Sequence, residues 1–227
     1  MITVHHLENS RSHRLLWLLE EMGLSYEMRR YERHPETSLA PPELQKIHPL
    51  GKAPILVDDE LVLAESGAII EYLMTTYDAG TWRPTDGTAA RRDYNFWLHY
   101  AEGSVMPLML LSLIMSRIET APMPFFVKPI AKQIAAKVRS GFLTHNVARH
   151  LRFMDDSLAN RDWFCGDELT AADIQMSFPV EAAEARSDLA SDYPRLSDFL
   201  ARIRERPAYR RAIEKGGPYQ LMGGKSD

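Results

Sequence analysis

The fold is decided by the run His48-Pro49-Leu50-Gly51-Lys52-Ala53-Pro54-Ile55-Leu56 and by Glu65-Ser66-Gly67-Ala68-Ile69-Ile70-Glu71-Tyr72-Leu73, which follows it closely. Pro54 directly precedes the apolar run 55–57, which is typical of a strand. A proline belongs at the first residue or the edge of a strand because it has no N–H. It also tolerates a cis peptide bond, and a cis Ala53-Pro54 bond would turn the Ala53 main chain outward. The run therefore predicts a free main-chain edge on which an extended peptide can pair.

Polar and charged groups surround this predicted edge. Gly51 allows the main chain to approach closely, and Lys52 places a cation beside it. A turn at 58–60 and a return strand at 61–63 lead to Glu65-Ser66, where a helix begins. The N-terminus of a helix carries free N–H groups that bind anions, and a serine hydroxyl adds a further donor. The stretch therefore suits an extended peptide with a carboxylate at each end and a free amine.

The two runs together resemble the N-terminal domain of the cytosolic glutathione transferases, whose usual form is N-P-x-G-K-V-P followed by E-S-x-A-I and Y-L. His48 stands where the family has asparagine and Ala53 where it has valine, and neither departure removes a group used here. The resemblance implies that the peptide is glutathione. It also implies a role for each matching position: Lys52 for the glycine carboxylate with His48 nearby, Ala53 and Pro54 for the cysteinyl main chain, and Glu65 and Ser66 for the γ-glutamyl end.

Composition and charge narrow the class of protein. The 227 residues suffice for one or two domains, and 45% apolar content is ordinary for a globular chain. A net charge of −4 without a block of like charge argues against a nucleic-acid partner. Cys165 is the single cysteine, which excludes an intramolecular disulfide and fits a reducing compartment. With no signal-peptide layout, and with its longest apolar run (105–115) too short to span a bilayer, we expect a cytoplasmic protein without a membrane span.

The order of elements predicts an α/β N-terminal domain. A strand at 2–7, a helix at 12–22 and a strand at 26–31 are followed by two strands and a helix from Ser66. This βαβ-ββα order is the thioredoxin-like arrangement, although the redox C-x-x-C pair is absent. We expect the domain to span 1–78, with a Gly- and Pro-containing linker at 79–88.

The remainder, 89–227, predicts an all-α helical bundle. We expect a helix at 89–116 that Pro107 kinks or divides, an irregular stretch around Pro122, Pro124 and Pro129, and a helix at 131–158. Thr170 and Asp173 predict a capping box. Losing the Thr170 cap should cost about 1 kcal/mol, and more if the cap is buried. Helices should begin at Pro194 and Pro207, and the Gly-rich tail from Gly216 should be mobile. The run G-x-x-L-T-x-A-D-I around the box resembles the structural capping motif of the same family.

The loop after the first strand carries the candidates for thiol activation. A thiolate forms more readily beside a donated hydroxyl and the positive end of a helix dipole. The loop offers Asn9, Ser10 and Ser12. By resemblance to the Ser-type transferases of bacteria and fungi, Ser10 with Arg14 four residues later is the expected donor. Asn9 and Ser12 remain alternatives, as does a role of either serine as a simple helix cap; the loop has no tyrosine and no cysteine.

The second substrate should lie between the domains, against the first helix of the bundle. Candidates for this electrophile pocket are Tyr100, Ser104, Met106, Met109 and Leu110, with Phe125 and Phe126 as a lid. Methionines and aromatic residues at helical spacing equally predict plain core packing. The eight histidines form no spacing typical of a ligand set, so we expect no metal.

The resemblance implies a glutathione S-transferase that forms a homodimer and acts in detoxification. Glutathione would be the co-substrate, and its thiolate would attack a hydrophobic electrophile or reduce an organic hydroperoxide. Two alternatives stay open. One is a glutathione-dependent enzyme of the same fold with one narrow reaction, such as isomerisation, dehalogenation or ether cleavage. The other is a non-catalytic protein of this fold that binds a ligand or a partner.

Overall fold

The computed structural model describes residues 1–217 and contains a four-stranded mixed sheet. The strands, β1 (Ile2–Leu7), β2 (Tyr26–Tyr31), β3 (Ile55–Asp58) and β4 (Leu61–Ala64), lie in the order β2-β1-β3-β4. β1 and β2 are parallel, whereas β3 is antiparallel to both β1 and β4. Parallel strands need a crossover, which α1 (Ser12–Met22) supplies, so the thioredoxin-like prediction is confirmed.

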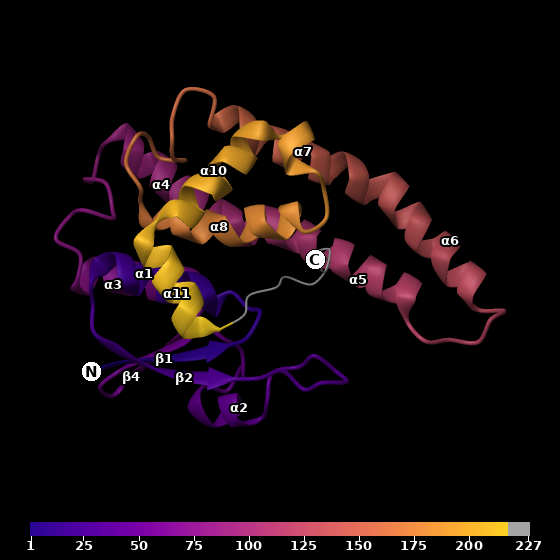
Figure 1. Cartoon of the computed structure of the whole chain (residues 1–227), viewed down its shortest axis with the longest axis horizontal. Helices are drawn as coiled ribbons and strands as arrows, with labels where there is room; N and C mark the ends of the chain where they lie inside the picture. The colour runs from indigo at the N-terminus through magenta and orange to yellow at the C-terminus, as the bar shows by residue number, and fades with distance from the viewer. Residues whose placement is uncertain (218–227) are drawn as a thin grey trace.

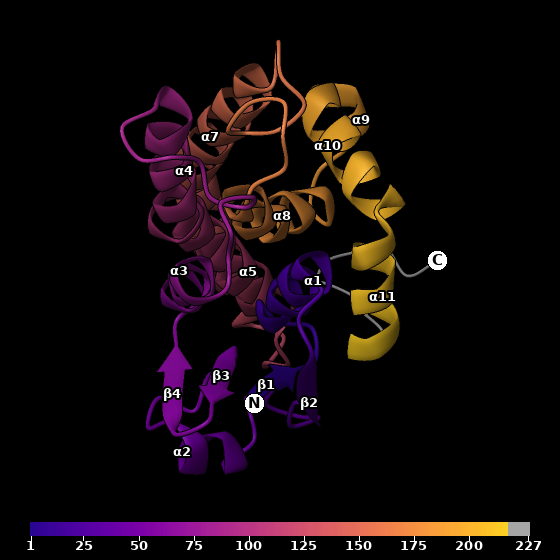
Figure 2. The ribbon, with the colours of Figure 1, turned by 90° about the vertical axis from the view of Figure 1, so that its left-hand side faces the viewer.

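Helices cover both faces of the sheet. α1 and α3 (Ser66–Thr76) lie on one face, and the short α2 (Glu43–Ile47) lies on the other (Figure 2). The first eight residues of α1 are all buried, because the helix lies between the sheet and the helical part of the chain. Gly23 ends α1 with a φ of 64°, a left-handed conformation that glycine adopts without steric cost.

The helical part begins with a long rod. α4 (Ala89–Tyr100), a π-helical segment η1 (Ala101–Val105) and α5 (Met106–Thr120) follow without a break. Pro107 lies in the first turn of α5, where its missing N–H is tolerated, and the wider π turn comes just before it. The expected division at Pro107 therefore takes the form of a π-helical segment within a continuous helix.

A second rod returns beside the first. It consists of α6 (Lys128–Val138), the π-helical segment η2 (Arg139–Leu143) and α7 (Thr144–Ser157). Pro129 lies in the first turn of α6, so the expectation that it belongs to the irregular stretch was wrong. Proline is favoured at that position, since the N–H it lacks would have no partner there.

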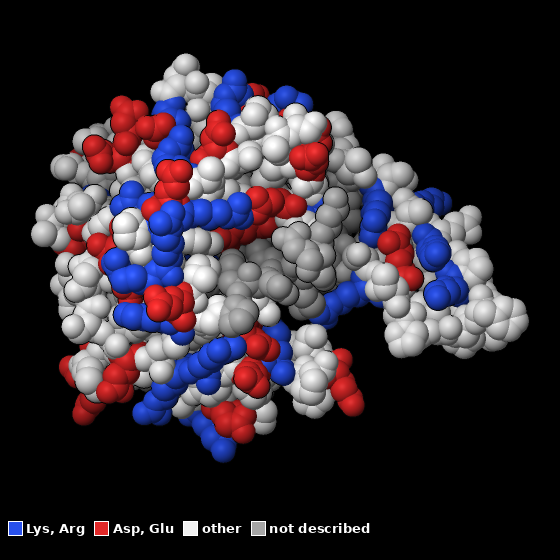
Figure 3. Space-filling view, viewed as in Figure 1, with Lys and Arg blue, Asp and Glu red and all other residues white. Residues whose placement is uncertain are grey.

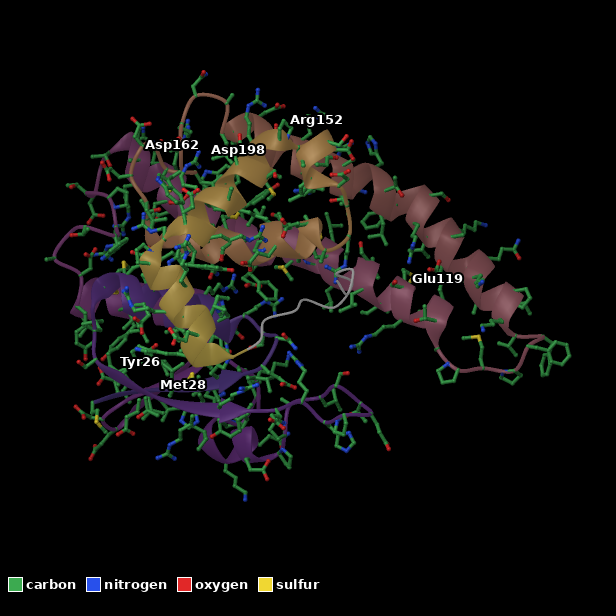
Figure 4. All side chains as sticks on the ribbon, in the orientation of Figure 1. Tyr26, Met28, Glu119, Arg152, Asp162 and Asp198 are labelled. Atoms are coloured by element: carbon green, nitrogen blue, oxygen red, sulfur yellow. The ribbon has the colours of Figure 1, made fainter. Side chains whose placement is uncertain are left out.

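The rods form an arm that leaves the body of the molecule. α5 and α6 extend together away from the sheet, and the loop joining them is the tip (Figure 1). A small separate core holds them together, made of Leu108, Met115, Ala135 and Leu143. Glu119 faces α6 (Figure 4) and forms a 2.8 Å ion pair with Arg139.

The centre of the helical part is α8 (Ala171–Glu184), which is buried along almost its whole length. Thr170 and Asp173 form the predicted capping box, and Asp173 also accepts from the Phe164 N–H at 2.7 Å. Three further helices close the chain: α9 (Leu189–Asp192), α10 (Pro194–Glu205) and α11 (Pro207–Gly216). α11 packs on α1 beside β2, and the Lys215 ammonium lies 5.0 Å from the centre of the Tyr26 ring (Figure 4).

The strands and the helical part occupy separate stretches of the described chain. In the described chain, every strand lies before Asp78 and only helices follow Ala89. The expectation for the tail falls mainly on 218–227, outside the described residues. One described helix, Ala89–Thr120, is long and apolar enough to cross a membrane by length and composition, and it places Tyr94 and Trp97 in the protein core.

Candidate functional site

Three loops meet at one edge of the sheet. His5 of β1 pairs with Ile55 of β3, which pairs with Ala64 of β4. Because β3 is antiparallel to both neighbours, β1 and β4 end on the side of the sheet where β3 begins. This end of the three strands is called the shared edge of the sheet below. The loop with Ser10, the Ala53-Pro54 bond and the Glu65-Ser66 pair are therefore brought together, although they are up to 56 residues apart in the chain.

The middle loop carries the predicted peptide-binding edge. The Ala53-Pro54 bond is cis, with Pro54 buried and Ala53 half-buried. Lys52 is exposed, and no described residue forms an ion pair with it. His48 ends α2, and its Nδ1 accepts from the Leu50 N–H at 3.3 Å. The arrangement offers a main-chain edge with a free cation beside it.

The third loop ends at the N-terminus of α3. Glu65 is exposed and has a φ of 71°, a conformation that is strained for a residue with a Cβ. Ser66 is buried as the first residue of the helix, and its Oγ accepts from Arg14 Nη2 at 3.1 Å. Free N–H groups at a helix N-terminus such as this one are suited to binding a carboxylate.

The hydroxyls of Ser10 and Ser12 belong to one buried hydrogen-bond chain. Nε2 of His6 lies 3.1 Å from the Gly216 carbonyl oxygen, which only accepts, so Nε2 carries a proton. Burial lowers the pKa of His6 to about 4, so the ring is neutral and its Nδ1 accepts from the Ser12 hydroxyl at 2.8 Å. Ser12 has no second proton, and Ser10 therefore donates to it across 2.7 Å.

Depth separates the candidate donors of this loop. Ser12 is completely buried, whereas Ser10 keeps 6% of its surface and is the outer hydroxyl of the chain. Ser10 Oγ also accepts from the Ser12 N–H at 3.2 Å, which holds it at the N-terminus of α1. Asn9 has a φ of 48°, and its carbonyl accepts from Arg33 at 3.2 Å. The outer hydroxyl thus combines partial access with the positive end of the α1 dipole.

A buried arginine lies behind the N-terminus of α3. The Arg14 side chain is 2% exposed, pairs with Glu102 of η1, and donates to the Gln175 main-chain oxygen at 2.7 Å. Arg11 also pairs with Glu102, at 3.2 Å. Nothing in the local sequence marks Glu102, which falls within a long predicted helix. Its contacts with α1 exist only because the helical part packs against the sheet domain.

The predicted pocket residues lie in different surroundings. Tyr100 bonds to His150 of α7 through its hydroxyl and packs among aromatic rings of the helical core. Met106 is buried in the main core, and Ser104 is half-buried. Phe125 and Phe126 lie at the tip of the arm, far from the shared edge of the sheet (Figure 1), which does not fit a lid.

The described side chains include no accessible thiol and no group of metal ligands. Cys165 is buried, and burial raises the pKa of its thiol well above the usual range, which keeps it protonated. Within residues 1–217, no three histidine, cysteine or acidic side chains are grouped as a metal site. Cys165 is therefore not an accessible nucleophile.

The comparisons with known proteins agree with this arrangement. The family model for the glutathione S-transferase N-terminal domain matches residues 1–75, and that for the C-terminal domain matches residues 120–215. The chain is 36% identical to glutathione S-transferase 3 of Schizosaccharomyces pombe over 215 residues, covering 95% of this chain and 88% of the relative. It is 35% identical to glutathione S-transferase 1 of Saccharomyces cerevisiae, over 95% of each chain.

Solved structures point the same way. A glutathione S-transferase from Actinobacillus pleuropneumoniae has a TM-score of 0.77 at 34% identity, covering 95% of this chain and 93% of the other. A homolog from Lodderomyces elongisporus, solved with two GSH per subunit, has a TM-score of 0.72 at 19% identity, covering 94% and 98%, and shows the fold alone. The chain belongs to the glutathione S-transferase family. Its fold and enzyme class are those of a glutathione transferase, with glutathione as the co-substrate.

Proposed function

We propose that, when glutathione binds, the Ser10 hydroxyl turns from Ser12 to the ligand and donates a hydrogen bond to the sulfur, which stabilises the thiolate. The observation that carries this proposal is the position of Ser10 as the outer hydroxyl at the start of α1, on the edge shared with the cis-Pro loop. A thiol of this kind has a pKa of about 8.5 in water. Lowering it by two units requires about 2.7 kcal/mol, which one charge-assisted hydrogen bond and a helix dipole supply.

The remaining contacts of glutathione follow from the three loops. Lys52 is a free cation for the glycine carboxylate, with His48 on the same loop. The main chain at Ala53 pairs with the cysteinyl residue as one more short strand, and Pro54 holds that edge in place. The γ-glutamyl end then lies at the N-terminus of α3, with its carboxylate on Ser66 and its amine toward Glu65.

The second substrate is a hydrophobic electrophile or an organic hydroperoxide, bound between the sheet domain and the helical part. Met106 and Met109 belong to the core that both parts share, and Ser104 is half-buried in η1. Tyr100 belongs to the same core, and its hydroxyl bonds to His150 of α7. The domain limits are 1–78 and 89–227, with the linker between them. A cytoplasmic detoxification enzyme without a nucleic-acid partner fits the near-neutral, mixed surface charge (Figure 3).

The enzyme acts as a homodimer in this proposal. Leu110, Ile114 and Ile118 are exposed at four-residue spacing along α5, and Ile130 and Ile134 are exposed along α6. Exposed apolar side chains that gather on one part of a protein are typical of a surface that another protein covers. The tip is also uncharged, with Phe125 87% exposed (Figure 3). A second copy of the chain would cover this surface.

The test is an ultraviolet titration of the bound thiol with pH. In the wild type, the thiolate absorbance of the glutathione complex should appear well below the free value of about 8.5. Ser10→Ala should raise that midpoint and cut turnover with a standard electrophile, while glutathione binding stays within a few-fold.

Asn9→Ala serves as the matched control and should leave the midpoint unchanged. An unchanged midpoint in Ser10→Ala would instead assign the effect to Asn9 or to the helix N-terminus. A wild-type midpoint at the free value, with tight binding, would replace the transferase with a non-catalytic binding protein. An activated thiolate that attacks no general electrophile would favour an enzyme with one narrow reaction.

A further inference from the structure

Arg14 connects the two parts of the protein at the N-terminus of α3. Its Nη1 donates to the main-chain oxygen of Gln175 on α8, and its Nη2 donates to Ser66 Oγ on α3. The same Nη2 pairs with Glu102 of η1. The ring of Phe178 lies 5.5 Å below the guanidinium carbon. One buried side chain of α1 therefore touches two helices of the helical part, α8 and η1, and the predicted ligand-binding turn.

The contact with Ser66 has a defined polarity. A guanidinium has only donors, so Ser66 Oγ accepts from Arg14 and keeps its own proton. Within the described chain, no acceptor lies in hydrogen-bond reach of that proton. It is therefore available to an acceptor that comes from outside, beside the free N–H groups of the first turn of α3.

We propose that Arg14 is a positioning residue that sets the affinity of this turn for the α-carboxylate of the γ-glutamyl residue. It acts through Ser66, whose hydroxyl it holds as a donor, and through its positive charge behind the helix N-terminus. Glu102 and the Gln175 main chain hold Arg14 in place, so the helical part regulates a ligand contact made entirely by the sheet domain. This inference rests on the proposed glutathione site.

Glu102 holds Arg14 in place but should weaken the attraction of Arg14 for a ligand carboxylate. Its carboxylate partly neutralises Arg14, and therefore weakens the field that Arg14 exerts on a ligand carboxylate. Arg11 shares the same carboxylate from the exposed side. Removing the charge of Glu102 should thus tighten carboxylate binding, although the change breaks an ion pair between the two parts of the protein. A purely structural role for the cluster predicts the opposite.

The experiment compares two ligands on the full chain by calorimetry. The ligands are glutathione and γ-aminobutyryl-cysteinyl-glycine, which keeps the amine and the peptide but lacks the α-carboxylate. The dissociation constant of the analogue divided by that of glutathione measures how strongly the protein uses the α-carboxylate, and a larger ratio means a stronger carboxylate contact. Arg14→Gln should lower this ratio about tenfold, as expected for the loss of a charge-assisted contact, and leave the pKa of the bound thiol unchanged. Glu102→Gln should raise the ratio a few-fold.

Two further variants complete the design. Gln175→Leu removes a buried side-chain amide that has no hydrogen-bond partner among the described residues, but keeps the main-chain oxygen that Arg14 uses. It should leave the ratio unchanged. In a Ser66→Ala background, Arg14→Gln should lower the ratio much less than in the wild type, because Arg14 can no longer act through the Ser66 hydroxyl.

Each result that contradicts the inference has its own interpretation. If Arg14→Gln weakens both ligands equally, or if Glu102→Gln lowers the ratio, Arg14 has only a structural role and the inference is overturned. If Arg14→Gln keeps its full effect in the Ser66→Ala background, it does not act through Ser66. If the wild type binds neither ligand, the proposed glutathione site itself has failed.

Discussion

At the scale of single residues, the loop that carries Ser10 contains an order of hydrogen-bond donors and acceptors that cannot be read from the sequence. Ser10, Ser12 and Asn9 all lie in the loop after the first strand, and in the sequence only the resemblance to the Ser-type transferases favours Ser10. In the fold, Ser12 donates inward to the buried His6, so Ser10 becomes the outer member of the chain. The depth of each hydroxyl and the neutral state of His6 together separate the candidates. Neither property can be read from neighbouring residues.

The burial of His6 predicts a pH dependence of folding stability. The folded state does not protonate this ring until a pH of about 4, whereas the unfolded chain takes up the proton near the ordinary value of 6.5. Stability from this residue is thus complete above pH 6.5 and falls as the pH decreases toward 4. Between pH 7 and pH 5 the loss should be about 2 kcal/mol, at about 1.4 kcal/mol per pKa unit.

Urea unfolding at the two pH values measures this loss. His6→Gln should lower stability at pH 7, because it breaks the chain to Ser12, but should show a smaller difference between pH 7 and pH 5. The matched control is His99→Gln on the exposed side of α4, which should keep the wild-type difference. An identical difference in His6→Gln would show that His6 is not the group responsible.

At the scale of elements, the start of α8 is the most completely specified feature of the helical part. The Thr170 N–H and hydroxyl both donate to the Asp173 carboxylate, at 2.9 and 2.7 Å. The same carboxylate reaches back to the Phe164 N–H and so fixes the preceding loop. A local motif of four residues is sufficient to predict this cap, since all but the Phe164 contact lie within one turn.

Because the Thr170 cap is buried, its loss should lower the stability of the protein more than the loss of an exposed cap. Thr170→Ala should lower the free energy of unfolding by about 2 kcal/mol, the upper end for a capping residue, because buried donors and acceptors lose their partner. Thr88→Ala is the control, as Thr88 caps α4 through the Arg91 N–H but is exposed. It should cost only about 0.5–1 kcal/mol. Equal losses in denaturant unfolding would show that burial adds nothing to the cap.

At the scale of the whole molecule, the arm formed by α5 and α6 exposes apolar side chains that packing within a single chain leaves uncovered. Its own core is small, and it leaves apolar side chains exposed along both helices. Such a surface is stable in water when a partner of matching shape covers it. The proposed homodimer therefore makes the arm its main interface.

Charges introduced on the arm test the dimer. Ile114→Glu and Ile134→Glu together should convert the protein to monomers, measured by sedimentation equilibrium, because two carboxylates would be buried without partners. The control is Leu39→Glu, another exposed apolar residue that lies in the sheet domain. It should leave the dimer intact. A wild-type protein that sediments as a monomer at every concentration would contradict the proposal.

The sequence alone determined what nearby residues encode: the strands, most of the helices, the loop at Pro54, the capping box at Thr170, the start of α10 at Pro194, and the family. It could not determine the position of Glu102 against Arg14, the inward donation of Ser12 to His6, or the course of the arm beyond Pro129. The first two features join residues that are 88 and 6 positions apart, and the third depends on which helix face meets another part of the protein. Periodicity and capping signals act within one or two turns, so only the tertiary packing could decide them.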